Sequence, residues 1–425
     1  MVEDMSAKEL ERALPGISGQ FALDIRDGSR RLLVRDPLGI NKLFFAVRAD
    51  GSPDSDNFLV SLVERGHALK DIYSVPSGHI ARIDAAAREL ELEKYANLAF
   101  NEGSGEGEGE DLDLDTRATE IRARLETVFG RLAKVLAGRP LYVTLSGGLD
   151  STTIATLTRR HIGPFTAVTF SMSGPGNEGE ESEDLRFARL VADRLDVPIE
   201  TVFATPGEIV ALVDDALVWG QDWREFNVHC ALVNARIAAY LGERHAGGGE
   251  ARPVVLTGDT MNELVADYSP VSYAGSEFYA LPRLTPGRLR RFLVSGLDSG
   301  DREVGVFARH GIDVIQPYAM LADAYAALPD AFVADPGAKQ RLVEKVMGDA
   351  IPREIYERPK VRAQIGGADE VGGTLAALVD AGFTGERLLQ RFAELLHSTP
   401  EEVGRFIRAG FYRFTNRFPR GDTDR

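Results

Sequence analysis

The sequence lacks the features that would mark several classes of protein. Its 425 residues include one cysteine, Cys230, so no disulfide can form within the chain, which favours a reducing compartment. No apolar run reaches the length of about 18 residues that suggests a membrane span. Residues 1–16 also lack the basic start and apolar stretch of an export signal. We therefore expect a cytoplasmic protein with no membrane partner.

Basic residues and metal-binding histidines are scarce as well. The chain has 65 Asp and Glu against 49 Lys and Arg, a formal net charge of −16. Proteins that grip nucleic acid usually carry a basic surface, because neutralising phosphates supplies much of their affinity. We therefore expect no nucleic-acid partner. The seven histidines are scattered and show no zinc-ligand spacing.

What is present falls into three regions. Residues 1–98 are rich in alternating apolar patterns, including FALDI, RRLLVRD and KLFFAV, and the stretch DNFLVSLVE also looks β-rich, so we expect a small β domain. Residues 99–115 are rich in glycine and acid and predict a flexible linker. In residues 116–425, short apolar strands alternate with helical patterns, and the part after Ser276 looks mainly helical. This predicts an α/β fold with a doubly wound parallel sheet.

The stretch VTLSGGLDSTT, residues 143–153, ends one of these strands. Gly147 and Gly148 allow an anion to approach the backbone, and the start of a helix adds partial positive charge. Ser146 and Ser151 can donate hydrogen bonds to phosphate. Asp150 would repel a bare phosphate but suits a Mg²⁺ ion that phosphates also bind. The stretch therefore predicts a site for Mg²⁺ and a polyphosphate.

The string SGGLDS resembles the pyrophosphate loop of N-type ATP pyrophosphatases, which cleave ATP to AMP and pyrophosphate. No GxxxxGK[ST] string of γ-phosphate-releasing NTPases occurs. The resemblance implies ATP as the nucleotide. It also implies that the α-phosphorus is left open to an acceptor, which for a carboxylate gives an acyl-adenylate.

Three later strings resemble the asparagine synthetase and β-lactam synthetase family. They are LTGDTMNELVADY (256–268), HGIDVIQPYAM (310–320) and IPREIYERPKVRAQIGG (351–367). Together with the loop they follow the family's order over residues 116–370. The RPK string with its glycine-rich continuation looks closer to the β-lactam and carbapenam synthetase branch.

The resemblance extends upstream. GQFALDIRD and VRDPLGINKLFFAV resemble the later half of the class II glutaminase domain fused to asparagine synthetases. That domain uses an N-terminal cysteine as its nucleophile, and here no cysteine precedes Cys230. We therefore expect residues 1–98 to be a truncated glutaminase-like domain without glutaminase activity.

The resemblance also implies catalytic roles. Lys360 of the RPK string matches the lysine that stabilises the oxyanion of the tetrahedral intermediate. Asp259 and Asp313 match the positions of a residue pair at the amine site. As two carboxylates they could share a proton and supply a general base, or they could bind a substrate ammonium. The sequence leaves both roles open.

Metal and nucleotide contacts follow in the same way. Asp150, Asn262 and Glu263 are the expected Mg²⁺ ligands; because an amide is a weak ligand, Glu263 or water would supplement Asn262. Lys339 is expected to contact pyrophosphate. The remaining nucleotide-binding candidates are Gly258 after the second strand and three residues near the end of TAVTF, namely Val168, Phe170 and Ser171.

The sequence thus predicts an AMP-forming amide synthetase that uses ATP and Mg²⁺. It would adenylate a small carboxylic acid and couple it to an amine, and we expect both to be derived from amino acids. The coupling would occur either within one molecule, as in β-lactam synthetases, or between two. One alternative is asparagine-synthetase-like amidation with free ammonia or with ammonia from a separate glutaminase partner. Another is a non-catalytic nucleotide-binding scaffold. A homodimer is left open.

Overall fold

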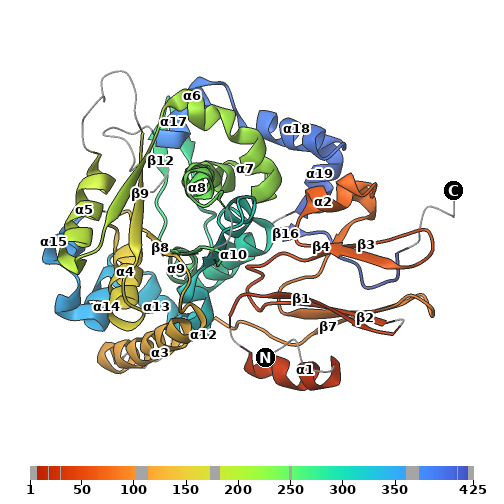
Figure 1. The fold of residues 1–425 in the computed structure, drawn as a ribbon, viewed down its shortest axis with the longest axis horizontal. Coiled ribbons are helices and arrows are strands. Elements are labelled where there is room, and N and C mark those ends of the chain that lie inside the picture. The colour runs from red at the N-terminus through yellow and green to blue at the C-terminus, as the bar shows by residue number, and fades with distance from the viewer. Residues whose placement is uncertain are drawn as a thin grey trace.

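The computed structural model describes residues 7–17, 19–28, 30–100, 113–172, 182–247, 251–359, 373–408 and 410–419. Antiparallel sheets form the N-terminal part, and a parallel sheet with helices follows (Figure 1). The α/β class expected from the sequence is confirmed. Among the described residues, no helix combines the length and apolarity needed to cross a membrane. Most of the expected linker, residues 101–112, lies outside the described ranges.

The described residues of the N-terminal part form two antiparallel sheets. The larger has the order β1-β2-β6-β7, and the smaller has the order β4-β3-β5. Their strands are β1 (Ala22–Asp27), β2 (Arg30–Arg35), β6 (His79–Asp84), β7 (Glu89–Lys94), β4 (Pro53–Asp56), β3 (Phe44–Val47) and β5 (Tyr73–Ser74). Leu33 of one sheet and Phe45 of the other share a buried apolar cluster. The sheets therefore pack through their apolar faces.

One expected β segment is a helix. Residues Leu59–Glu64, inside DNFLVSLVE, form α2. Leu59 and Leu62 are its buried residues, three positions apart, so both lie on one helical face. The β-rich interpretation of this stretch was wrong because its apolar run is short enough to fit either period.

The parallel sheet has five strands within the described residues, in the order β10-β9-β8-β11-β14. They are β10 (Ile199–Ala204), β9 (Thr166–Met172), β8 (Leu141–Thr144), β11 (Val254–Leu256) and β14 (Asp313–Ile315). The chain builds outward from β8, first to β9 and β10 and then, on the other side, to β11 and β14. The strand order thus reverses between β8 and β11, and ligands of such sheets bind beyond the carboxyl ends at this point.

Helices cover both faces of this sheet. Leu141 and Val143 of β8 join an apolar cluster with α3 (Leu114–Val135), α4 (Leu149–His161) and α5 (Glu183–Leu195). Tyr142, between them, joins a second cluster with α7 (Val213–Gly220) and α8 (Glu225–Arg244). Alternate strand residues point to opposite faces, so one apolar run serves two cores.

The remaining elements surround these cores or connect them. They are α1 (Ala7–Ala13), α6 (Pro206–Ala211), α9 (Met261–Val265), β12 (Val271–Tyr273), β13 (Ser276–Phe278), α10 (Pro286–Ser299), α11 (Val304–Ala308), α12 (Ala322–Ala326), α13 (Asp330–Val333), α14 (Ala338–Met347), α15 (Arg353–Glu357), α17 (Gly373–Asp380), α18 (Gly385–Leu395), α19 (Pro400–Phe406), β15 (Ile407–Arg408) and β16 (Phe411–Tyr412). Single 3₁₀ turns cover Leu14–Gly16, Leu69–Asp71, Pro317–Leu321 and Gly348–Ala350.

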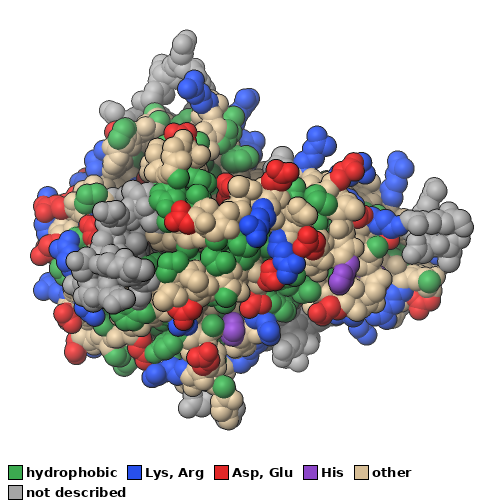
Figure 2. Space-filling model, turned by 90° about the horizontal axis from the view of Figure 1, so that it is seen from above, with side chains coloured by type: hydrophobic (Ala, Val, Ile, Leu, Met, Phe, Trp, Pro, Cys, Tyr) green, Lys and Arg blue, Asp and Glu red, His purple; other side chains and the backbone are tan. Residues whose placement is uncertain are grey.

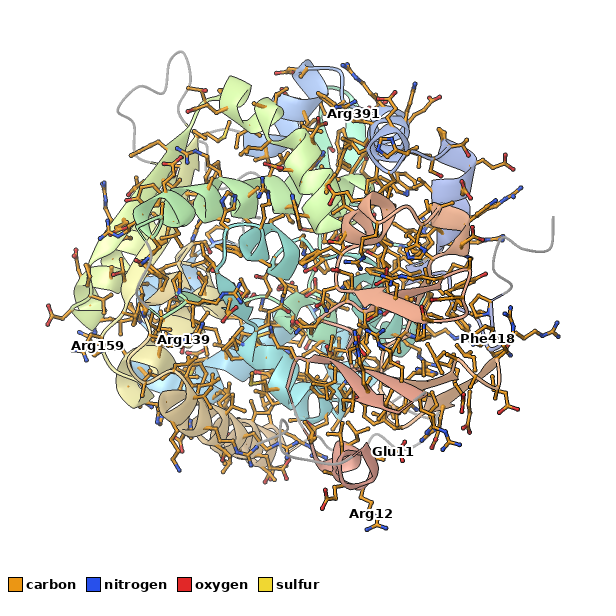
Figure 3. All side chains as sticks on the ribbon, turned by 45° about the vertical axis from the view of Figure 1, so that its right-hand side comes forward. Glu11, Arg12, Arg139, Arg159, Arg391 and Phe418 are labelled. Carbon is orange, nitrogen blue, oxygen red and sulfur yellow. The ribbon has the colours of Figure 1, made fainter. Side chains whose placement is uncertain are left out.

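The end of the chain returns to the N-terminal sheets. The Ser74 backbone N–H donates to the Arg413 carbonyl at 2.8 Å, and the Tyr412 ring packs edge-on against Phe44 at 5.0 Å between centroids. Phe418, labelled in Figure 3 beside these sheets, packs on the cluster that contains Leu33. Acidic and basic side chains are intermingled on the face drawn in Figure 2.

Candidate active site

A cavity of about 730 Å³ lies beyond the carboxyl ends of β8, β9 and β11. It is lined by residues of the 144–151 segment, β9, α8, the 258–268 segment, residues 302–303, residues 333–340 and residues 355–359. This is the point where the strand order reverses, as expected for a nucleotide-binding sheet.

The loop between β8 and α4 is held in a fixed shape. Gly147 has a φ of +70°, and a Cβ on it would lie 2.4 Å from the Phe187 Cβ, so this position requires glycine. The Ser151 hydroxyl donates to the Gly148 carbonyl at 3.2 Å and accepts from the Ser146 N–H at 3.3 Å. These contacts wrap the loop around the start of α4, where backbone N–H groups are available to an anion.

The segment after β11 packs directly on this loop. A Cβ on Gly258 would lie 2.7 Å from the Ser151 backbone nitrogen and 2.9 Å from the Asp150 carbonyl carbon. Only glycine permits so close an approach of the two backbones. It brings Asp150, at the start of α4, next to the residues that follow β11.

Side-chain oxygens of Asp150, Asn262 and Asp267 surround the Lys339 ammonium. Lys339 Nζ lies 2.5 Å from Asp150 Oδ2, 2.7 Å from Asn262 Oδ1 and 3.3 Å from Asp267 Oδ2. Burial opposes the charge of Lys339, but Asp150 and Asp267 outweigh it and hold the pKa of Lys339 above its usual value. The cluster therefore favours a cation.

The residues of this cluster fit Mg²⁺ in the nature of their donors. Asp150 Oδ1 is buried and has no hydrogen-bond partner within the described part of the chain. With the Asn262 amide oxygen and the Asp267 carboxylate it offers the hard oxygen ligands that Mg²⁺ prefers. No group of three His, Cys, Asp or Glu side chains in the described ranges has a metal-binding arrangement. A metal here would thus keep water or phosphate ligands.

The structure does not bring Glu263 to this cluster. Its carboxylate accepts from Arg302 Nη2 at 2.7 Å and from the Tyr268 hydroxyl. Burial raises the pKa of Glu263, but Arg302 and Tyr268 more than offset burial and leave it below the usual value. The expected metal role of Glu263 needs correcting: its charge is already neutralised by Arg302, and Asp267 lies in the cluster instead.

Asp313 does not lie beside Asp259, so the expected pair is not formed. Asp313 is the first residue of β14 and is in register with Val254, the first residue of β11, so it lies at the amino edge of the sheet. There it forms ion pairs with Arg139, labelled in Figure 3, and with Arg252 at 3.4 Å. The cavity is at the opposite, carboxyl edge.

Glu303 is the carboxylate that acts on Asp259. Both side chains line the cavity. Burial, followed by the negative charge of Glu303, raises the pKa of Asp259 to about 8. Burial also raises the pKa of Glu303, while Arg302 opposes the rise. Near neutral pH Asp259 therefore holds a proton, while Arg302 favours the ionised form of Glu303.

Arg302 links these carboxylates and was missed by the sequence analysis. Its Nε donates to Glu303 at 2.5 Å, its Nη2 donates to Glu263 at 2.7 Å, and its guanidinium lies 5.0 Å from the Phe226 ring centroid. The signal was three consecutive charged residues, Asp301 to Glu303, before an apolar run. Such a run is usually solvated, but all three are buried here.

Arg358, in the RPK string, is the second functional residue that was missed. Its Nη1 donates to the Ser146 carbonyl at 2.7 Å, and its Nη2 forms an ion pair with Asp184. Burial raises the pKa of Asp184 to about 6, although Arg358 opposes the rise. Lys360 lies outside the described residues, and Arg358 and Pro359 line the cavity just before it.

The three nucleotide-binding candidates on β9 differ in where they lie. Val168 and Phe170 line the cavity, as does Thr169 between them. Ser171 is buried, donates to the Ser182 hydroxyl at 3.2 Å and is not among the lining residues in the described ranges. The nucleotide role expected for Ser171 is therefore not supported by its position.

Comparison with known proteins agrees with this geometry. Residues 126–303 match the family model described as Asparagine synthase. This segment is therefore similar in sequence to the asparagine synthase family. The family consists of AMP-forming amide ligases. The matched segment includes Asp150, Asp259 and Glu303, which all line the cavity.

Other comparisons add little to the domain assignment. No curated protein matches the chain. The structure of NMN synthetase from Francisella tularensis is similar at 13% identity and a TM-score of 0.32, over 68% of this chain and 91% of that one. A similarity this low carries no further argument. The similarity to the asparagine synthase family thus rests on the family match over residues 126–303.

Proposed function

We propose that the chain is an ATP-dependent amide synthetase that adenylates a small carboxylic acid and couples the acyl group to an amine. One observation carries the proposal: a single cavity joins the phosphate-binding loop and Asp150 to the carboxylates Asp259 and Glu303. The first set, which we call the phosphate end of the cavity, suits a polyphosphate, and the second set, the amine end, suits an ammonium. A synthetase of this type needs both.

In the proposed first step, an oxygen of the substrate carboxylate attacks the α-phosphorus of ATP. The bond from that phosphorus to the bridging oxygen breaks, and pyrophosphate leaves from the loop. Asp150, Asn262 and Asp267 would hold Mg²⁺, which neutralises phosphate charge when bound. Lys339 lies among these same oxygens and can follow the leaving pyrophosphate as a second positive charge.

In the proposed second step, a neutral amine attacks the acyl carbon, the bond from that carbon to the phosphate oxygen breaks, AMP leaves, and the nitrogen releases a proton to solvent as the amide forms. An amine that enters as ammonium must first lose a proton. Asp259 already holds a proton near neutral pH, whereas Arg302 favours the ionised form of Glu303, so Glu303 is the proposed acceptor of that proton. Lys360 is proposed, from the family resemblance, to stabilise the oxyanion. Ring closure within one substrate and coupling of two substrates are both forms of this step.

A panel of amino-acid-derived carboxylic acids tests the proposal. Each acid is incubated with ATP, Mg²⁺ and labelled pyrophosphate, and exchange of label into ATP is measured. Exchange that depends on one acid supports adenylation, and Asp150→Asn should abolish it. Formation of ADP and phosphate would contradict the proposal. Nucleotide binding without exchange across the panel would favour the scaffold alternative.

Mass spectrometry of the product then identifies the amine. A product lighter than the acid by one water indicates ring closure, as in β-lactam synthetases. A product that contains ammonia or a second substrate indicates coupling between molecules. The domain boundaries, with a glutaminase-like β domain in residues 1–98, a linker in 99–115 and a synthetase domain in 116–425, are part of the same proposal.

A further inference from the structure

The segment 297–303 carries Arg302 and Glu303 to the cavity, and the N-terminal sheets hold it. Arg35, the last residue of β2, is fully buried. Its Nη2 donates to the Asp298 carbonyl at 2.9 Å, and its Nη1 lies 2.6 Å from Asp298 Oδ1. A residue of the N-terminal part thus fixes both the backbone and the side chain of Asp298.

Lys42 makes a second contact with the same segment. Its Nζ donates to the Leu297 carbonyl and, at 2.8 Å, to the Gly39 carbonyl, and only 1% of the residue is exposed. Burial lowers the pKa of Lys42 to about 8, and Asp301 is the strongest opposite charge acting on it. Asp301 directly precedes Arg302 in the chain.

Gln20 makes a third contact, on the other side of Glu303. Its Nε2 donates to the Val314 carbonyl at 2.5 Å, and its Oε1 accepts from the Gln316 N–H at 2.9 Å. The Gln316 side chain in turn accepts from Thr260 at 2.7 Å and donates to Glu303 at 3.4 Å. Gln316 therefore bridges the residue next to Asp259 and Glu303 itself.

These contacts are costly if their only purpose is adhesion between two parts of the chain. Buried charged groups lose their hydration, and well-packed apolar side chains usually stabilise an interface as well or better. Directional hydrogen bonds to the Leu297 and Asp298 carbonyls instead fix where the segment lies. Among the described residues, the N-terminal part contributes none that line the cavity.

We propose that Gln20, Arg35 and Lys42 of the N-terminal β region are positioning residues, which place Arg302 and Glu303 against Asp259 and so shape the amine end of the cavity. The phosphate loop is held by other contacts, from Arg358, Phe187 and Lys339. Loss of the N-terminal contacts should therefore disturb the amine end and spare the phosphate end. The inference rests on the proposed function, because that function supplies the names phosphate end and amine end.

The chain supplies a reporter for each end. Cys230, its one cysteine, lines the cavity and interacts electrostatically with Arg302. Because a nearby guanidinium favours the thiolate, the pH at which a disulfide reagent labels Cys230 reports the position of Arg302. Binding of α,β-methylene-ATP with Mg²⁺, measured by calorimetry, reports the phosphate end. Neither measurement requires turnover, so both can still be read if the chain binds nucleotide but does not couple an acid to an amine.

The variants are Lys42→Met and the milder Gln20→Ala. Arg290→Met is the matched control. Arg290 is a buried cation, as Lys42 is, but it lies on α10 and pairs with Asp330. Thermal unfolding shows that each variant is folded at the assay temperature. We expect both test variants to shift the labelling midpoint to higher pH, with analogue affinity within about twofold, and the control to shift neither.

Two results would overturn the inference. One is an unchanged labelling midpoint in folded Gln20→Ala and Lys42→Met. The other is an equal loss of analogue affinity, which would make the contacts a general support of the fold. Once an acid is known from the exchange panel, coupling in the test variants should fall by about tenfold or more while exchange stays within about twofold.

Discussion

The two ends of the cavity differ in how their charges are balanced. At the phosphate end, Lys339 contacts Asp150 and Asp267, and Arg358 contacts Asp184. At the amine end, as far as the chain is described, Arg302 pairs with both Glu263 and Glu303 while Asp259 forms no ion pair. The phosphate end is ready to receive an anion with its metal. The carboxylates of the amine end outnumber its cation, so a bound ammonium would neutralise negative charge there.

The largest effect should come from removing the cation of the amine end. Arg302→Met leaves Glu263 and Glu303 buried without their partner, which typically costs about 3–5 kcal/mol in the free energy of unfolding. Urea unfolding measures the loss. Arg391→Met is the control, because its ion pair with Asp214 is on the surface and is expected to contribute about 0–1 kcal/mol. Equal losses in the two variants would contradict the charge imbalance described here.

A smaller effect should come from the backbone of the phosphate end. Gly147→Ala places a Cβ at positive φ and against Phe187, and we expect a loss of about 2–4 kcal/mol in stability together with weaker nucleotide binding. Gly148→Ala is the matched control, since its φ is −80° and the nearest atom to its Cβ is the Ser146 hydroxyl at 3.4 Å. Thermal unfolding should separate the two variants clearly. Similar stabilities would show that the loop tolerates a different shape.

The phosphate end was readable from the sequence, because its parts are local. An apolar strand followed by Ser146-Gly147-Gly148 and then by a helix predicts that Asp150 lies at the start of that helix, beside the loop. The amine end depends on β14, a three-residue strand too short to show a period. Because β14 could not be predicted, the position of Asp313 as its first residue, at the amino edge of the sheet, could not be predicted either.

The partner of Asp259 was equally hidden. Glu303 lies 44 positions further along the chain and reaches Asp259 through irregular segments whose path depends on tertiary contacts, including those of Lys42. Three consecutive charges at 301–303 also look like solvated surface by pattern alone. Buried charge networks of this kind are where local sequence rules give way to packing.

The proton on Asp259 gives the amine end a pH dependence. With a pKa of about 8 in the folded state, above the ordinary value of about 3.9, Asp259 binds a proton that the unfolded chain releases between these values. Stability from this group is therefore full below about pH 4 and is lost as pH rises toward about 8. Between pH 5 and 8 the thermal unfolding temperature should fall less steeply in Asp259→Asn than in the native chain. Parallel curves would place the proton elsewhere, on Glu303 or Glu263.

The same proton affects coupling with the opposite sign. As pH rises through about 8, Asp259 ionises and becomes a further acceptor for the proton of the substrate ammonium. Coupling should therefore increase over this range, measured as kcat against pH with saturating acid and amine. The amine itself also loses its proton as pH rises, and Asp259→Asn separates the two causes. A variant that keeps the native profile would assign the profile to the amine.

The smallest effect tests where the phosphate end stops. Ser171 follows Phe170 on β9, and its side chain donates to Ser182 at the start of α5 instead of lining the cavity. Ser171→Ala should cost about 1 kcal/mol in stability, the usual net contribution of such a hydrogen bond, and leave the affinity for α,β-methylene-ATP within about twofold. Phe170→Ala, which opens the cavity wall, should weaken binding more. If Ser171→Ala weakens binding as strongly as Phe170→Ala does, the nucleotide reaches deeper along β9 than the cavity in this structure extends.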